Sequence, residues 1–345
     1  MKFGKKPAGA GEEGPPKKAL HTEKLDAAKM AKLRDLLSRK LWVPFAVEHA
    51  AFAYKDDGVN VVGYASGKLV VSGKKTEDFV INILEPEITG VAKLGYDEVH
   101  HPEWFTDHAG LDESGKGDLF GPVVSATVIA SEDMVRGWID SGVRDSKAVG
   151  SDAAILALER KIRATPGVTI KTVCGGMRRY NELYVKFGNN LNKLLAWMHA
   201  AGLDEALKSW EAAGNVRPTW GLLDQFSTAP LVQRELTKRG QDFDLQMRTK
   251  AESDPVVAAA SIIARARFVR ELNALSDKCG LPLPKGSGGN ARDIAKKLVE
   301  KYGDDALADY AKLHFRTAYE ARGMPVPAKK DPGIFRRPGG GMQKA

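Results

Sequence analysis

The chain has 345 residues, of which 28% are charged, and its formal net charge is +8. This length allows two domains with a sizeable core. The positive charge makes nucleic acid the first candidate among partners, although solubility alone also accounts for a charge of this size. No apolar run is long enough for a membrane span, and the N-terminus lacks the apolar core of a signal peptide. Cys174 and Cys279 are far apart without metal-ligand spacing, which predicts a reduced cytoplasmic protein and no Cys/His zinc site.

The first 90 residues predict a tail followed by a small α+β domain. Residues 1–22 are rich in Gly, Pro, Ala and Lys and predict a flexible tail. Amphipathic helices are expected at about 22–41 and at 76–84. Three strand-like runs separated by glycine turns lie between these helices, at 46–53, 59–64 and 68–73. We therefore expect a small domain over residues 23–90, followed by a linker over 91–108.

Residues 109–322 predict a larger domain in which strands and helices alternate. Strand-like runs are found at 123–130, 168–174 and 219–224. Helical patterns cover 134–141, 151–163, 180–207, 256–275 and 290–302. This alternation indicates an α/β domain built on a mixed sheet. The last residues are again rich in Pro, Gly and Lys, which predicts a second flexible tail over 323–345.

The most informative stretch of the larger domain begins with two adjacent carboxylates. Asp112 and Glu113 are followed by the turn Gly115-Lys116-Gly117 and then by a β-branched run. Paired acids where a strand ends can bind a divalent metal, and glycines there let a backbone approach a ligand closely. The alternative is a solvated turn with a glycine hinge, which the long ordered run of acid, glycine and base makes the weaker interpretation.

Two further acidic segments lie next to predicted element ends in the same domain. Asp224 ends a predicted strand, and Glu252 and Asp254 come just before a predicted helix. Converging carboxylates suit Mg²⁺ or Mn²⁺, and two such ions would activate a water and stabilise the leaving oxygen of a phosphodiester. Each acid also has a structural alternative, as a turn residue at Asp224 or as a helix-capping group at Glu252 and Asp254.

The block from Asp112 to Pro122 resembles the signature of the type 2 ribonucleases H. Its lysine between two glycines resembles ribonuclease HIII, because ribonuclease HII usually carries arginine there. Further segments resemble the same family in the same order, at 142–147, 180–184, 190–199, 223–226, 250–264, 283–286 and 312–315. The resemblance covers about residues 43–320, and several independent motifs in one order make a chance match improbable.

The resemblance implies a ribonuclease H-like fold and metal-dependent endonucleolytic cleavage of RNA paired with DNA, leaving 3′-hydroxyl and 5′-phosphate ends. The residues carried over as catalytic, metal-binding acids are Asp112, Glu113, Asp224 and Glu252. Asp254 competes for the fourth position, because the interval from Lys250 to Ser261 is one residue shorter than the family's pattern.

The resemblance also implies contacts with the nucleic acid. Gly115, Lys116 and Gly117 would present backbone and side-chain groups to the RNA strand, whose 2′-hydroxyl distinguishes it from DNA. Lys147 would contact a phosphate, and its alternative is a surface lysine in a loop.

The N-terminal unit resembles the small TATA-binding-protein-like domain that precedes the nuclease in ribonuclease HIII. The most similar piece runs from Tyr64 to Leu69. Tyr64 and Lys68 are candidates for substrate contact, because a basic, aromatic-bearing sheet suits a sugar-phosphate backbone. A plain hairpin role is the alternative for both residues. Nothing in the sequence indicates an obligate assembly, so we expect a monomer.

Two other functions are alternatives to this one. The first is a ribonuclease HII-like incision at single ribonucleotides embedded in DNA, against which Lys116 and the N-terminal domain argue. The second is a non-catalytic protein that binds hybrids, against which the intact set of acids argues. Cleavage of a duplex with one ribonucleotide distinguishes the first alternative, and binding without cleavage would favour the second.

Overall fold

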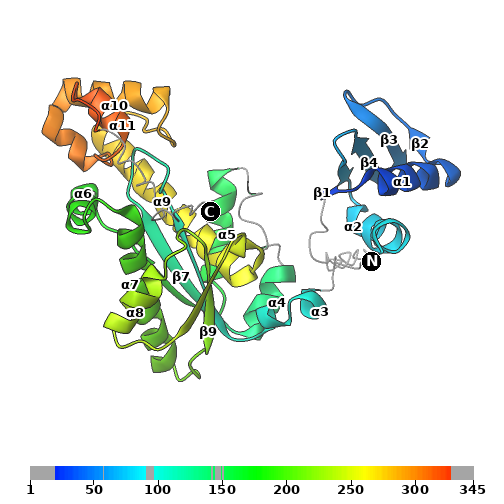
Figure 1. Ribbon diagram of the computed structural model, residues 1–345, viewed down its shortest axis with the longest axis horizontal. Coiled ribbons are helices and arrows are strands. Elements are labelled where there is room, and N and C mark those ends of the chain that lie inside the picture. Colours follow the sequence, from blue (N-terminus) through cyan, green and yellow to red (C-terminus); the bar gives the residue numbers. More distant parts are fainter. Residues whose placement is uncertain are drawn as a thin grey trace, which may run out of the picture. The chain divides into compact units, whose positions relative to one another are not determined.

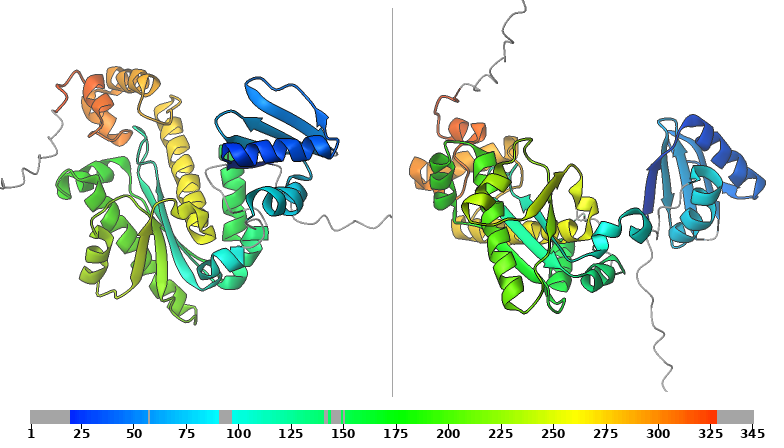
Figure 2. Two further views of the ribbon diagram at one scale, coloured as in Figure 1. Left: turned by 45° about the vertical axis from the view of Figure 1, so that its right-hand side comes forward. Right: turned by 60° about the horizontal axis from the view of Figure 1, so that its bottom comes forward.

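The computed structural model describes residues 20–56, 58–90, 97–140, 143, 149 and 151–327. The chain divides into two compact units, Met1–His108 with Ala130–Asp145, and Ala109–Ile129 with Ser146–Ala345. The first unit therefore also contains residues 130–145, which the sequence predicted to belong to the larger domain over 109–322. Figures 1 and 2 show the elements of both units. None of the helices in the described ranges is long and apolar enough to cross a membrane.

The first unit is built on an antiparallel sheet with the strand order β1-β5-β4-β3-β2. Its strands are β1 (Leu20–Lys24), β2 (Val43–Pro44), β3 (Ala50–Asp56), β4 (Val59–Tyr64) and β5 (Lys68–Ser72). Strand β1 lies where the sequence predicted the end of a tail and the start of a helix. Its sequence is mostly polar and therefore did not predict a strand. Pairing with β5 supplies the hydrogen bonds that hold these residues extended.

The helical segments of the first unit are α1 (Ala27–Arg39), α2 (Thr76–Phe79), the π-helix η1 (Val80–Thr89), α3 (Asp97–His100), the 3₁₀ helix η2 (Pro102–Phe105) and α4 (Glu132–Asp140). Asp26 caps α1 by accepting a hydrogen bond from the backbone N–H of Lys29. Leu33 and Leu37 are fully buried against the apolar side chains of β4, β5 and η1. The predicted linker over 91–108 thus contains two short helical segments in its described part.

The second unit is built on a mixed sheet with the strand order β10-β9-β6-β7-β8. Its strands are β6 (His108–Ser114), β7 (Val124–Ala130), β8 (Thr169–Val173), β9 (Trp220–Asp224) and β10 (Asp244–Arg248). Strand β9 is parallel to both β6 and β10, whereas β7 and β8 are antiparallel to each other. The predicted mixed α/β architecture is confirmed. The sequence missed β10, a partly exposed edge strand with polar residues at both ends.

The helical segments of the second unit are α5 (Asp152–Arg163), α6 (Met177–Lys186), α7 (Leu191–Ala212), α8 (Leu231–Lys238), η3 (Ala251–Ser253), α9 (Pro255–Cys279), α10 (Gly289–Tyr302), η4 (Asp304–Asp309) and α11 (Arg316–Ala321). Helices α7 and α9 flank the sheet from opposite sides (Figures 1 and 2).

Two glycines let these helices pack directly on the strands. A Cβ at Gly110 of β6 would lie 2.3 Å from the backbone of Val256 in α9, and one at Gly202 of α7 would lie 3.1 Å from the Thr127 hydroxyl of β7. The short helix η3 immediately precedes α9 and contacts the end of β9, the strand that neighbours β6.

Candidate active site

The register of the parallel strands places two predicted acids side by side. Leu111 of β6 is paired with Leu223 of β9, and the next residues along the two strands are Asp112 and Asp224. Both carboxylates therefore leave the sheet at the carboxyl ends of neighbouring parallel strands, where α/β sheets commonly form their ligand sites. This edge of the sheet, with Asp112, Glu113, Asp224 and Glu252 around it, is called the acidic edge below.

Asp112 and Glu113 point to opposite faces of the sheet, because successive side chains of a strand alternate. Asp112 shares the face of Gly110, packs toward α9 and forms a hydrogen bond with Ser261. Glu113 faces α7 and contacts His199. The pair therefore links the helices on the two sides of the sheet to one strand end.

Burial raises the pKa of Asp112 to about 6. The hydrogen bond from Ser261 and the backbone N–H of Glu113, which is 2.7 Å from Asp112 Oδ1, act in the opposite direction. The negative charge of Glu113 adds to the increase. A carboxylate in this environment has too little positive charge around it, which a bound cation would supply.

The pKa of Glu113 is shifted in the opposite direction. Burial alone would raise its pKa, but the hydrogen bond and charge of His199 and the charge of Lys116 outweigh burial and lower it. His199 Nε2 is 3.1 Å from Glu113 Oε2, and Lys116 Nζ is 3.7 Å from Oε1. Glu113 is consequently held ionised and in a fixed orientation.

His199 is a functional candidate to which the sequence analysis assigned no role. Its side chain is fully buried in α7, and its Nδ1 is 2.9 Å from the hydroxyl oxygen of Ser125 in β7. Because an ionised carboxylate only accepts hydrogen bonds, Nε2 donates to Glu113. The ring of Phe226 stacks on His199 with centroids 5.6 Å apart. The sequence feature that could have identified His199 is its position as a polar residue within an apolar helix. Its contacts, Glu113 and Ser125, are distant in the sequence.

The two competitors for the fourth acid have different surroundings. Asp254 is fully buried and caps α9, with Oδ1 accepting hydrogen bonds from the backbone N–H groups of Val256 and Val257 at 2.8 and 3.1 Å. Glu252 lies in η3 and is partly buried. The same short helix is attached to the acidic edge, because the N–H of Ala251 is 3.4 Å from Asp224 Oδ1.

The donor set of the acidic edge fits a hard divalent cation. Carboxylate oxygens are the ligands that Mg²⁺ and Mn²⁺ prefer, and Asp112 and Asp224 emerge side by side from adjacent strands. In the described ranges, no three His, Cys, Asp or Glu side chains already converge as a formed metal cluster. Asp112, Asp224 and Glu252 are the side chains that would hold such an ion.

The glycine–lysine loop after β6 is held in place by the C-terminal part of the unit. Gly115 has a φ of +84°, and a Cβ there would lie 2.4 Å from the Pro122 carbonyl oxygen, so only glycine fits. A Cβ at Gly117 would meet nothing within 4 Å. The fully buried Lys312 donates hydrogen bonds to the carbonyl oxygens of Asp118, at 2.8 Å, and Gly121.

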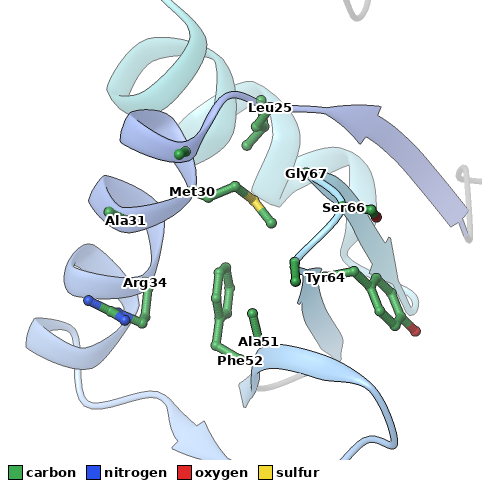
Figure 3. Close-up of a pocket in the computed structure, with 11 residues that line it drawn as sticks. Leu25, Met30, Ala31, Arg34, Ala51, Phe52, Tyr64, Ser66 and Gly67 are labelled. Atoms are coloured by element: carbon green, nitrogen blue, oxygen red, sulfur yellow. The ribbon is translucent and has the colours of Figure 1, made fainter.

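The remaining predicted contacts lie elsewhere. Lys147 is outside the described residues. Tyr64 ends β4 and Lys68 begins β5, both in the first unit. A Cβ at Gly63 would meet Phe52 and Met30 on the side of α1, so Tyr64 points to the opposite side. Figure 3 shows the ring of Tyr64 directed away from Phe52 and Met30, which line a pocket of about 380 Å³ beside α1.

The sheet face opposite α1 is called the open face below. Lys68 belongs to it, because the next residue, Leu69, is fully buried on the helix side. Lys24 is paired with Lys68 across β1 and β5, and it is exposed on the same face. The open face therefore combines an aromatic ring with at least two lysines, which is a composition suited to a phosphate backbone.

Comparison with known proteins identifies relatives over most of this length. The sequence profile of the Ribonuclease HII family matches residues 109–318. Ribonuclease HIII of Chlamydia caviae is 36% identical over 290 residues, which cover 84% of this chain and 92% of that protein. Ribonuclease HIII of Chlamydia trachomatis serovar D is 36% identical over 293 residues. The crystal structure of Bst-RNase HIII in complex with Mn²⁺ superposes with a TM-score of 0.61 and 28% identity, covering 88% of this chain and 98% of that one.

Proposed function

The chain belongs to the ribonuclease HII family, in its ribonuclease HIII branch, and from this premise we propose how its residues cut RNA paired with DNA. It is a ribonuclease H that hydrolyses the RNA strand of RNA/DNA hybrids with Mg²⁺ or Mn²⁺ as cofactor. The products carry 3′-hydroxyl and 5′-phosphate ends. The observation that supports the proposed site best is the strand register that sets Asp112 beside Asp224.

Asp112, Glu113, Asp224 and Glu252 are the catalytic acids and metal ligands in this proposal. A bound divalent ion supplies an activated water and charge stabilisation at the leaving oxygen. Asp112 and Asp224 provide oxygens from adjacent strand ends, and Glu252 completes the set from η3. Asp254 is better explained as the cap of α9, because its Oδ1 already accepts two backbone hydrogen bonds.

Glu113 depends on a chain of side chains behind it. Ser125 fixes the orientation of His199, and His199 donates to Glu113, so the carboxylate keeps one orientation as the substrate binds. Lys116 contacts the other oxygen of Glu113 and sits in the loop that would meet the RNA strand. We assign His199 and Ser125 as positioning residues, because in this proposal they act only through Glu113.

Substrate recognition is divided between the two units. Gly115, Lys116 and Gly117 present the loop that reads the 2′-hydroxyl, and Lys147 would contact a phosphate. Tyr64 and Lys68 on the open face contact the sugar-phosphate backbone. We also propose that the protein acts as a monomer in the cytoplasm, where its two free cysteines would stay reduced.

The test uses two labelled duplexes with the wild-type protein, in Mg²⁺ and separately in Mn²⁺. One is a continuous RNA/DNA hybrid, and the other is DNA with a single embedded ribonucleotide. Cleavage of the hybrid alone is the expected result. Efficient incision at the single ribonucleotide would contradict the assigned role of the Gly115–Gly117 loop, and binding without cleavage in either metal would contradict the assignment of the acids.

A further inference from the structure

One lysine lies inside the second unit, against the inner side of the glycine–lysine loop. Lys312 is fully buried, although lysine side chains almost always reach water. Burial lowers the pKa of its ammonium group to about 7, and the charge of Asp118 opposes this decrease. The buried charge is less favourable here than in water, so it destabilises the fold at neutral pH. A residue kept at such a cost calls for a role, and its contacts indicate which one.

The amino group of Lys312 is directed at two backbone carbonyl groups of the loop. Its Nζ donates hydrogen bonds to the carbonyl oxygen of Asp118, at 2.8 Å, and to that of Gly121. On another side, Nζ lies 5.6 Å from the centroid of the Tyr180 ring in α6. One side chain therefore holds two peptide groups of the loop. An apolar side chain of similar length would leave both carbonyl oxygens without this donor.

The backbone of the C-terminal segments holds the same half of the loop. The N–H of Lys312 donates to the carbonyl oxygen of Leu119 at 2.9 Å, and the N–H of Gly121 donates to that of Tyr310 at 3.1 Å. The N–H of Leu119 donates to the carbonyl oxygen of Gly286 at 2.9 Å. The second half of the loop, residues 118–121, therefore turns several of its carbonyl groups toward the interior of the unit.

The first half of the loop is open by comparison. A Cβ at Gly117 would meet nothing within 4 Å, and the side chain of Lys116 is 41% exposed. The loop thus has one half that is fixed from inside and one half that is free to meet a ligand. Carbonyl oxygens repel an anionic strand, so their retention on the inner side favours the approach of RNA to the open half.

We propose that Lys312 is a positioning residue for ribose recognition, because it fixes the second half of the loop and with it the arrangement of Gly115–Gly117 that meets the RNA strand. This inference rests on the proposed hydrolysis of hybrids. Lys312 acts only through the loop, since its full burial prevents contact with the strand. The selectivity of the enzyme for ribose then depends on a C-terminal segment that is distant in sequence from both the loop and the acids.

The experiment compares Lys312→Met with wild type on two hybrids. In one hybrid the RNA strand contains ribose throughout, and in the other a single 2′-deoxynucleotide lies next to the measured cut. The readout is the ratio of kcat/KM for the first hybrid to that for the second. Loss of the ammonium group should lower this ratio about ten-fold, the size of one misplaced hydrogen bond. A merely structural role would not change the ratio, because a smaller folded fraction lowers both rates equally.

Two controls match the substitution in different respects. Lys278→Met removes an exposed lysine at the end of α9, whose Nζ lies 5.5 Å from the centroid of the Tyr310 ring. Leu298→Ala removes a fully buried side chain from α10 and so destabilises the C-terminal part of the unit without touching Lys312. Both variants should keep the ratio within two-fold of wild type.

A second variant decides the matter if Lys312→Met fails to fold. Asn181 in α6 donates to the carbonyl oxygen of Ala311 at 3.0 Å and accepts from the N–H of Leu313 at 3.0 Å. It therefore holds the chain on both sides of Lys312. Asn181→Ala retains the ammonium group but loosens its support, and it should lower the ratio two- to three-fold.

The outcomes separate this inference from the proposed function. A ratio that neither Lys312→Met nor Asn181→Ala changes would overturn the inference and leave the hydrolysis intact. An equal change in Leu298→Ala would also overturn it, because the ratio would then report stability alone. Failure of wild type to cut any hybrid would instead overturn the proposed function.

Discussion

The acidic edge of the second unit and the open face of the first unit use charge in different ways. At the acidic edge, carboxylates are partly buried and fixed by specific partners, as when His199 and Lys116 hold the two oxygens of Glu113. On the open face, Lys24 and Lys68 are exposed side chains on paired strands. Buried, oriented charge acts on one bond, whereas exposed charge attracts a polyanion with little demand on geometry.

This contrast predicts where substitutions should reduce turnover and where they should reduce binding. Changes at the acidic edge should lower kcat steeply and leave the affinity for hybrid nearly unchanged. Changes on the open face should raise KM and alter the salt dependence.

Asp112→Asn should lower kcat by about a thousand-fold, because it removes a ligand from a site that must concentrate divalent charge. Circular dichroism and hybrid binding should be retained, and Asp277→Asn, an exposed residue of α9, is the control. Retention of full activity at saturating metal would show that Asp112 is not an essential metal ligand.

The same substitution should stabilise the metal-free protein. Burial raises the folded-state pKa of Asp112 to about 6 from 3.8, so ionisation destabilises the fold as pH rises through this range. Above pH 6 the cost is complete, at about 2–3 kcal/mol in the free energy of unfolding, and below about pH 4 it is absent. Urea titrations of Asp112→Asn at pH 8 and pH 4 should show a gain at the higher pH alone.

Glu252→Gln and Asp254→Asn should separate catalysis from folding. Loss of Glu252 should lower kcat about a hundred-fold with the free energy of unfolding unchanged. Loss of the Asp254 carboxylate weakens the two hydrogen bonds that cap α9, so it should cost about 1 kcal/mol of stability with kcat nearly retained at low temperature. The reverse pattern would make Asp254 the fourth acid.

His199→Ala should lower kcat about ten- to a hundred-fold and raise the metal concentration needed for half-maximal activity, as expected when a ligand loses its orienting partner. Ser125→Ala should give a smaller loss of the same kind, because His199 then keeps its contact with Glu113. His199→Gln retains a donor and should recover part of the activity. A loss confined to thermal stability would indicate a purely structural histidine.

Much of this organisation was predictable from local sequence, and the parts that were not depend on distant partners. The strand before Asp224 and the helix after Asp254 follow from apolar periodicity, so both were expected near their observed positions. The adjacency of Asp112 and Asp224 could not be predicted from local pattern, because it depends on which strands pair and in which register.

The role of His199 was hidden for a similar reason. The hydroxyl group that His199 contacts, that of Ser125, is 74 residues away in the sequence. Ser125 lies on a strand whose apolar pattern predicts only core packing. Strand β1 was missed because its polar alternation acquires meaning only from pairing with β5. Sequence pattern thus predicted most of the elements and proposed the acids as candidates, while the contacts that orient these acids are visible only in the fold.

The metal requirement should depend on pH through Asp112. Protons compete with the cation below the raised pKa of about 6, so the metal concentration for half-maximal activity should increase about ten-fold per pH unit below that value. Ser261→Ala removes the hydrogen bond that lowers this pKa, and it should shift the profile to higher pH. A profile that Ser261→Ala leaves in place would mean that another group controls metal binding.

The smallest effects are expected on the open face. Lys68→Ala should raise KM about three- to five-fold at moderate salt and leave kcat unchanged, because one exposed lysine contributes on the order of 1 kcal/mol to backbone binding. Tyr64→Ala should act similarly by removing an aromatic contact to the sugar-phosphate face. The control is Lys74→Ala, an exposed lysine in the turn after β5 that lies outside the paired strands. The KM difference should vanish at high salt for Lys68→Ala but persist for Tyr64→Ala, since only the charge is screened. A fall in kcat for either variant would mean that the open face helps to align the scissile bond, and the separation between binding and turnover would no longer hold.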